Sequence, residues 1–330
     1  MPDIKILNEG DLRHAVQLDA DAVNCIENAF ELLATRDVAM PPILSMHIPE
    51  QNGELDVKTA YVPGIPSFAV KMSPGFFDNP KLGFPSVNGL MVVFSAKTGL
   101  VEAVLLDNGY LTDVRTAAAG AVAAKYLSRQ NATVAGIIGT GTQARLQLEA
   151  LLLVRNIERA IIWGRDQDKA DACAADCDQQ LGIETVATSS VDELAAASDI
   201  IVTTTPSTVP ILNAEHLHAG LHVTAMGSDA DYKTELAPEF LMGADRYICD
   251  RLAQCRKQGE LRGAIEAGLI TEDTVLPELG EIVAGRAPGR RSETEITICD
   301  LTGMGIQDTA IAAQAMKRSN ASQTGTIFLS

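Results

Sequence analysis

The pattern of apolar and polar positions changes twice in the first part of the chain, and each change predicts a different structure. Residues 11–36 carry apolar side chains at helical spacing, which predicts one or two amphipathic helices. Residues 40–110 contain short apolar or alternating runs separated by turns rich in glycine, proline and asparagine, which predicts a β-meander. Residues 112–128 are rich in alanine and open with threonine and aspartate, as helices commonly do.

From residue 133 onwards, predicted strands and helices alternate. TVAGIIG, RAIIWGR, ETVAT and DIIVTTTP have the composition of strands, and the segments between them have helical periodicity. HVTAMGS and RYICD add two further strands. Alternation at these lengths predicts a parallel sheet with helices on both faces. The last part of the chain predicts a strand, a glycine turn and a helix that crosses back to the first domain.

Composition and charge limit the possible partners. The chain has 330 residues, of which 46% are hydrophobic and 21% are charged, as in globular proteins. A formal charge of −17 argues against nucleic acid and anionic membranes as partners, because the summed field repels them. The first residues lack the apolar segment of a secretory signal, and no apolar run approaches the roughly 18–20 residues that span a bilayer. We therefore expect a cytoplasmic protein whose substrate is a small molecule.

The six cysteines are scattered and form no CxxC pair. Cys173 and Cys177 share one face of a predicted helix, but the five histidines do not complete a metal-ligand set around them. The sequence therefore predicts ordinary reduced thiols and no bound metal.

The segment GTGTQA, from Gly139 to Ala144, fits the pattern G-x-G-x-x-A between a predicted strand and a predicted helix. In that context Gly139 permits a tight turn, and Gly141 lets the backbone approach a pyrophosphate. Ala144 permits close packing of the helix on the strand. The free N–H groups at the helix start would face the anion. We therefore predict a dinucleotide site.

The second strand of this unit ends near the expected position of the adenosine ribose. Arg165 and Asp166 stand there. An acid accepts hydrogen bonds from the 2′-hydroxyl of NAD, whereas an arginine accommodates the 2′-phosphate of NADP. These two residues leave NAD(H) and NADP(H) both open.

Three charged residues outside this loop are candidates for substrate chemistry. Lys71 lies in a predicted apolar strand, where an ammonium group either reaches solvent or is held beside a reacting carboxylate or imine. Arg115 lies in the alanine-rich helix, where small neighbours leave room for a carboxylate, although many helix arginines are simply solvated. Asp229 follows a predicted strand at its carboxyl end, as either a ligand-binding or a turn residue.

Taken together, several stretches resemble the ornithine cyclodeaminase/μ-crystallin family over nearly the full length of the chain. The matching stretches are, in family order, AVKMSPGF, LTDVRTAAA, GTGTQA, VTTTP, GSDADYKTEL and DLTGMGIQDTA. The resemblance implies an α/β fold with a Rossmann dinucleotide-binding domain and a second α/β domain for substrate binding and homodimer formation. We place the second domain at residues 1–118, with a C-terminal helix at 306–330 packing back on it, and the Rossmann domain at 119–305.

The resemblance also implies roles for individual residues. Lys71 and Arg115 would bind the substrate carboxylate, and Asp229 would be the acid or base near the reacting nitrogen. The cofactor residues, with those predicted from the glycine loop and the second strand, would be Arg115, Thr116, Gly139, Gly141, Thr142, Gln143, Arg165, Asp166, Thr204, Thr205, Ser228 and Lys233.

One departure from the family pattern bears on the substrate. Cyclodeaminases of this family carry a further carboxylate-binding arginine in the early strand region, but this chain has no arginine between Arg36 and Arg115. The stretches MPPILSMHIPE, KMSPGFFDNPKLGFPS, LLDNGYLTDVRTAAAG and AMGSDADYKTELAP resemble a subgroup labelled ectoine-utilisation cyclodeaminase-like, which includes iminosuccinate reductase. The resemblance therefore favours NADH-dependent reduction of an α-imino dicarboxylate to L-aspartate, with Lys71 or Asp229 as proton donor.

The second carboxylate of such a substrate needs donors of its own. His47, Ser45 and Asn88 are the candidates, although His47 is equally well explained as a plain strand histidine. The alternative activities are an ornithine cyclodeaminase-type deaminating cyclase that uses NAD, and another ketimine or pyrroline-carboxylate reductase. A further alternative is a non-catalytic, crystallin-like ligand-binding protein.

Overall fold

The computed structural model describes residues 3–329, and the chain divides into two compact units. Unit 1 comprises Met1–Arg115 and Met304–Ser330, and unit 2 comprises Thr116–Gly303. The division falls within helix α3 (Tyr110–Leu127). Each unit has its own seven-stranded sheet.

The sheet of unit 1 is mainly an antiparallel meander, as the sequence predicts. Its strand order is β14-β1-β6-β5-β4-β3-β2, and among the strand pairs that the structure describes only β1–β6 is parallel. The strands are β1 (Ile4–Asn8), β2 (Leu44–Ile48), β3 (Gly53–Thr59), β4 (Ser67–Phe76), β5 (Leu90–Ser95), β6 (Val101–Leu106) and β14 (Thr326–Phe328).

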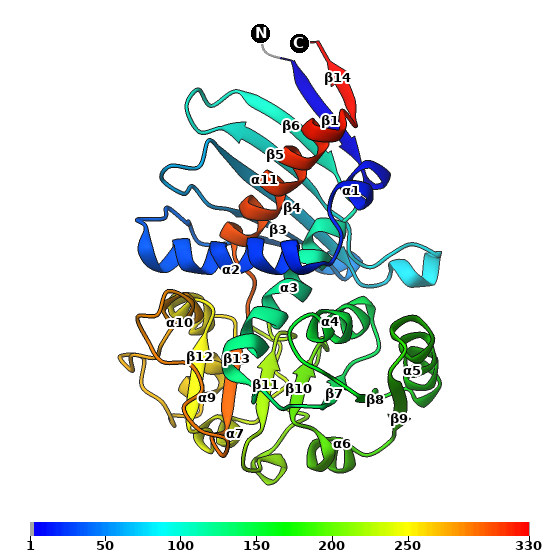
Figure 1. Cartoon of the computed structure of the whole chain (residues 1–330), viewed down its shortest axis with the longest axis vertical. Helices are drawn as coiled ribbons and strands as arrows, with labels where there is room; N and C mark the ends of the chain where they lie inside the picture. Colours follow the sequence, from blue (N-terminus) through cyan, green and yellow to red (C-terminus); the bar gives the residue numbers. More distant parts are fainter. Residues whose placement is uncertain (1–2, 330) are drawn as a thin grey trace. The chain divides into compact units, whose positions relative to one another are not determined.

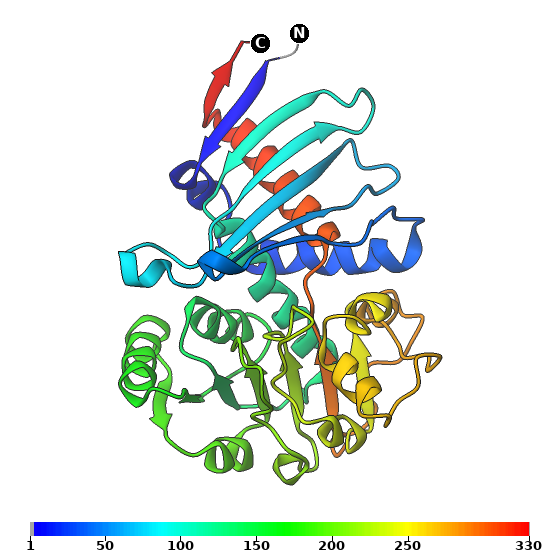
Figure 2. The ribbon, with the colours of Figure 1, turned by 180° about the vertical axis from the view of Figure 1, so that it is seen from behind.

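Helices cover one face of this sheet. They are α1 (Glu9–Ala15), α2 (Ala20–Thr35) and α11 (Gly305–Ser322), and α11 runs across the strands in Figure 1. Buried side chains of α11 such as Ile311 pack in one apolar cluster with Ala69 of β4 and Met91 of β5. Seen from behind in Figure 2, the strands lie in front of α11, and no helix of unit 1 within the described chain covers that face.

The sheet of unit 2 is fully parallel, with strand order β12-β13-β11-β10-β7-β8-β9. The strands are β7 (Val134–Ile138), β8 (Arg159–Trp163), β9 (Glu184–Thr188), β10 (Ile200–Thr203), β11 (His222–Ala225), β12 (Arg246–Cys249) and β13 (Thr297–Asp300). The strand order reverses between β7 and β10, where doubly wound sheets bind ligands. This confirms the predicted α/β fold class with a Rossmann-type unit.

Helices connect the strands of unit 2. They are α4 (Thr142–Leu152), α5 (Gln167–Leu181), α6 (Val191–Ala197), α7 (Pro238–Met242), α8 (Leu252–Cys255), α9 (Glu260–Glu266) and α10 (Leu279–Val283). Gly120 of α3 lets that helix approach α4, because a Cβ at this position would lie only 2.0 Å from Oε1 of Gln147. Among the residues that the structure describes, no helix combines the length and apolar composition needed to cross a bilayer.

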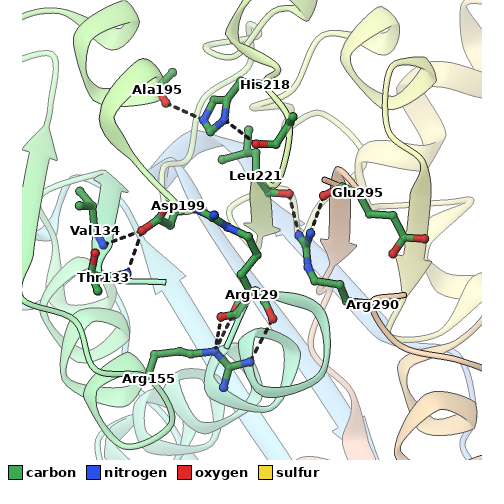
Figure 3. Close-up of polar contacts among 12 residues, drawn as sticks. Arg129, Thr133, Val134, Arg155, Ala195, Asp199, His218, Leu221, Arg290 and Glu295 are labelled. Carbon is green, nitrogen blue, oxygen red and sulfur yellow. Dashed lines mark hydrogen bonds and ion pairs between the residues drawn. The ribbon is translucent and has the colours of Figure 1, made fainter. Parts of the chain in front are cut away.

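Three arginines hold together the edge of this sheet where β7, β10 and β11 begin (Figure 3). Arg155 donates to the carbonyl of Ala124 at 2.8 Å, which satisfies a backbone acceptor at the end of α3. Arg290 binds carbonyl groups of the same edge, and Arg129 forms an ion pair with Asp199. These contacts fix the sheet at the edge opposite the glycine loop.

Candidate active site

A cavity of about 510 Å³ opens at the carboxyl ends of β7, β8 and β10 in unit 2. This is where strand order reverses, so the cavity lies where a doubly wound sheet binds a dinucleotide. Six of the predicted cofactor residues line it: Gly139, Gly141, Arg165, Asp166, Thr204 and Thr205.

The glycine loop has the backbone geometry that its sequence predicts. Gly139 has φ +133°, and a Cβ there would lie 2.2 Å from Oγ1 of Thr204. Gly141 is the N-cap of α4 and makes no side-chain cap, and a Cβ at this position would meet nothing within 4 Å. The backbone at Gly141 therefore leaves room for a ligand at the start of α4, where the first N–H groups of the helix could bind a pyrophosphate.

The adenosine end of the cavity presents both signs of charge. Asp166 caps α5, since its Oδ1 accepts from the backbone N–H of Lys169 at 3.2 Å. The carboxylate of Asp166, which would bind a 2′-hydroxyl, thus already accepts a hydrogen bond from the backbone of α5. The cationic side chains of Arg165 and Lys169 line the same cavity.

The other predicted cofactor residues in unit 2 lie outside the lining of this cavity. Gln143 accepts from Gln147, whose side chain also donates to the carbonyl of Thr116. Thr142 is the first residue of α4, and the buried hydroxyl of Ser228 donates to the carbonyl of Lys233 at 2.7 Å.

Glu235 is a buried carboxylate at the carboxyl ends of β10 and β11, and its sequence context did not single it out. It accepts hydrogen bonds from Thr203, Thr205 and Gly227, at 2.6 to 2.8 Å. Burial raises the pKa of Glu235 to about 7, although these hydrogen bonds act to lower it. Glu235 therefore joins the loop after β10 to the loop after β11 and positions both.

Lys71 and Arg115 converge on a single carboxylate in unit 1. Nζ of Lys71 lies 3.3 Å from Oδ2 of Asp308, and Nε of Arg115 donates to Oδ1 at 3.0 Å. Lys71 is 2% exposed and Arg115 is 5% exposed. The alternative of a solvated lysine and a solvated arginine is therefore wrong.

Burial and neighbouring charges perturb this cluster. Burial lowers the pKa of Lys71 to about 7, while the charge of Asp308 opposes that shift and the charges of Arg115 and Lys58 add to it. Burial alone would raise the pKa of Asp308, but Lys71, Arg115 and Lys58 together hold it below its usual value. Lys71 can thus exchange a proton near neutral pH.

Helix α11 supplies two groups to the cluster that the sequence analysis did not assign. Asp308 is one, and Gln307 is the other: its Oε1 accepts from Nη1 of Arg115 at 3.2 Å and from the N–H of Met304 at 3.2 Å. Both lie in the stretch DLTGMGIQDTA, which carries the family resemblance. Gln307 and Asp308 thereby fix the orientation of the Arg115 guanidinium.

The three residues suggested for a distal carboxylate are exposed in the structure. The hydroxyl of Ser45 donates to Asp56 at 2.6 Å, and the amide oxygen of Asn88 accepts from the N–H of Gly89 at 2.6 Å. His47 lies on β2, opposite Glu54 of β3. Ser45 and Asn88 therefore already have protein partners.

Asp229 belongs to unit 2, in the segment after β11. Its Oδ1 lies 2.6 Å from Nζ of Lys233, and 49% of its side chain is exposed. Its carboxylate is thus accessible while it pairs with a cation.

Comparisons with known proteins identify relatives over most of the chain. The family model described as the ornithine cyclodeaminase/mu-crystallin family matches residues 5–323. A Rhizobium meliloti protein, described as a candidate dehydrogenase, is 58% identical over 328 residues, which are 99% of each chain. The iminosuccinate reductase of Paracoccus denitrificans is 36% identical over 291 residues, covering 88% of this chain and 89% of its own.

Solved structures show the same architecture. An archaeal alanine dehydrogenase dimer with bound NAD superposes with a TM-score of 0.92 at 34% identity, covering 99% of each chain. The Δ1-pyrroline-2-carboxylate reductase of Thermococcus litoralis, with NADH and L-proline, gives 0.93 at 30% identity, covering 98% and 99%. The P. denitrificans iminosuccinate reductase with NAD+ gives 0.91 at 32% identity and full coverage of both chains.

Proposed function

Because the chain belongs to the ornithine cyclodeaminase/mu-crystallin family, we propose that it is an NADH-dependent imine reductase acting on an α-imino dicarboxylate. The reaction that we favour is reduction of iminosuccinate to L-aspartate. The observation that carries this proposal is the buried pair of Lys71 and Arg115 around Asp308. Relatives named as NAD-bound reductases and dehydrogenases support the reaction class.

In this proposal the substrate α-carboxylate binds to Arg115 and Lys71. The planar guanidinium of Arg115 suits a carboxylate, and Gln307 and Asp308 already hold it in one orientation. Lys71 or Asp229 gives a proton to the imine nitrogen. A nearby carboxylate also stabilises the protonated imine, which accepts a hydride more readily than the neutral one.

NAD(H) is the cofactor, and when bound as NADH it supplies the hydride that reduces the imine carbon. The glycine loop and the start of α4 fit its pyrophosphate, as the open space over Gly141 indicates. Arg165 and Asp166, which line the same cavity, would hold the adenosine ribose. Thr116, Thr142, Gln143, Ser228 and Lys233 complete the proposed cofactor set, with Thr204 and Thr205.

We also propose that the protein acts as a homodimer. The open face of the unit 1 sheet carries a stacked pair, Phe68 and Phe94, with ring centroids 5.4 Å apart. Leu44 and Met46, on the edge strand β2, are 60% and 48% exposed. An apolar surface of this kind favours association with a second copy.

One assay tests the proposed reaction. The protein is mixed with oxaloacetate, ammonium and NADH, NADH absorbance is followed, and the product is identified by chromatography. We expect NADH oxidation that requires both oxaloacetate and ammonium, with L-aspartate formed in equal amount. Absence of NADH oxidation, together with ammonia release from ornithine, would instead establish a deaminating cyclase.

A further inference from the structure

The residue that directly follows β8 is a glycine, although the end of β8 is where the adenosine ribose of the cofactor would bind. In dinucleotide-binding sheets an acid in this region binds the 2′-hydroxyl of NAD, whereas an arginine accommodates the 2′-phosphate of NADP. Gly164 leaves no room for an acidic side chain, because a Cβ there would lie 2.5 Å from Cγ2 of Thr140 in the glycine loop. The next residue is Arg165. This end of β8 therefore offers a cation before it offers an acid.

Asp166 is the first acid after β8, and it is committed to the start of α5. Its Oδ1 accepts from the backbone N–H of Lys169 at 3.2 Å, and its Oδ2 lies 3.7 Å from Nζ of the same lysine. The ammonium group of Lys169 offsets the negative charge of Asp166, which would otherwise repel a phosphate group. Asp166 thus acts as a helix cap whose charge is partly balanced.

The lining of the adenosine end of the cavity carries a positive balance of charge. Among the described residues that line the cavity, Arg165 and Lys169 are cationic and Asp166 is the one acid. The whole chain, by contrast, has a formal charge of −17. The side chain of Lys169 is 72% exposed and is therefore accessible to a ligand. A guanidinium group suits phosphate oxygens through its planar fork, and an ammonium group binds them as a point charge.

We propose that Lys169 and Arg165 bind the 2′-phosphate of NADPH, so that the protein uses NADPH as well as NADH. The solved relatives described above hold NAD or NADH, and no description of them assigns a role to a residue at the position of Lys169. The inference rests on the proposed function, in which a bound dinucleotide supplies the hydride. The 2′-phosphate takes no part in hydride transfer, so its recognition affects cofactor binding and not the chemical step.

The first test compares the two cofactors in the reduction assay with oxaloacetate and ammonium. We expect kcat/KM for NADPH to lie within about 10-fold of the value for NADH in the wild type. Lys169→Met should lower the value for NADPH about 10-fold, mainly through KM, and leave NADH within about 2-fold, because a charge-assisted phosphate contact is lost. Lys169→Arg, which keeps the charge, retains most of the NADPH activity. The control is Lys97→Met, at an exposed lysine in the turn between β5 and β6.

A second readout needs no reduction chemistry. Fluorescence of bound NADH is titrated with 2′,5′-ADP and with 5′-AMP, which differ by the 2′-phosphate alone. We expect the wild type to bind 2′,5′-ADP more tightly, and the ratio of the two affinities to fall about 10-fold in Lys169→Met. Asp166→Asn keeps a side chain that caps helices well but removes a charge that opposes the phosphate. In this variant the ratio should rise about 3-fold.

The outcomes separate this inference from the proposed function. If the wild type binds 2′,5′-ADP no more tightly than 5′-AMP, or if Lys169→Met weakens both nucleotides equally or neither, the inference is overturned. The reductase proposal then stands, because it requires NADH alone. If the wild type reduces no imine with either cofactor, the proposed function fails, and the fluorescence titration still decides whether Lys169 recognises the 2′-phosphate.

Discussion

The two units bury charged side chains in opposite ways. In unit 2, buried carboxylates are surrounded by donors: Glu235 is bonded to two threonines and Gly227, and Glu260 accepts from the backbone N–H of Glu235 and Leu236. In unit 1, Lys58, Lys71 and Arg115 gather around one carboxylate, Asp308. Acids that are satisfied by the protein stabilise its loops, whereas a buried lysine and a buried arginine that converge on one carboxylate are suited to an anionic ligand.

The largest effect that this comparison predicts is on turnover when Lys71 is replaced. Lys71→Met keeps much of the buried apolar stem but removes the ammonium group. We expect kcat/KM for the imino dicarboxylate to fall about 10⁴-fold, because a carboxylate contact and a proton donor are lost together. Steady-state kinetics measures this, with Lys97→Met, at an exposed lysine in the turn between β5 and β6, as the control. Unchanged turnover in Lys71→Met would remove Lys71 from the mechanism.

The next effect is on stability. Asp308→Asn removes the carboxylate that bridges Lys71 and Arg115, and so leaves these buried cations facing one another. We expect the free energy of unfolding in urea to fall by about 3 kcal/mol or more. Succinate at saturating concentration should restore part of the loss, because an anion replaces the missing charge. A variant as stable as the wild type would show that Asp308 is not needed to balance these cations.

The smallest predicted effect concerns Glu235 and its pH dependence. Burial raises its pKa from 4.5 to about 7 in the folded protein, so the folded state binds more protons than the unfolded state between these values. Its contribution to stability is therefore present at low pH and is lost as pH rises towards 8. Glu235→Gln should be about 1–2 kcal/mol less stable at pH 5, with a smaller difference at pH 8.

Urea unfolding of the two proteins at several pH values measures this difference, and the exposed variant Glu272→Gln is the control. A difference that grows as pH rises would show that the hydrogen bonds, and not burial, determine the pKa of Glu235.

Local patterns in the sequence predict much of this structure. Helical spacing in residues 11–36 predicts α1 and α2, and turn residues in 40–110 predict the meander β2–β6. The glycine loop predicts the dinucleotide site at the carboxyl end of β7. Each of these depends on residues close together in the chain. The pairing of β1 with β14 does not, because Ile4 and Phe328 meet across almost the whole chain. No local pattern indicates that pairing.

The candidate site shows the same limit. Lys71 and Arg115 stand out as charges in apolar or small-residue surroundings. Lys58 instead lies in an alternating strand, LDVKTAYV, whose polar positions are typical of a solvent-exposed face. Only the β3–β4 register and the cover provided by α11 show that this face is buried. Asp308 is 193 residues from Arg115, so their contact also requires the folded structure.

The central claim is that the buried cations of unit 1 form a site for a carboxylate ligand, and proton uptake on binding tests it most directly. Because burial lowers the pKa of Lys71 to about 7, its amine is mostly neutral at pH 8. A bound carboxylate raises that pKa again, so binding must take up a proton. Succinate is titrated into the NADH-saturated protein by calorimetry at pH 8, in buffers of different ionisation enthalpy. We predict uptake approaching about one proton per chain, and none in Lys71→Met. Succinate binding without proton uptake, or equal uptake in Lys71→Met, would contradict the account.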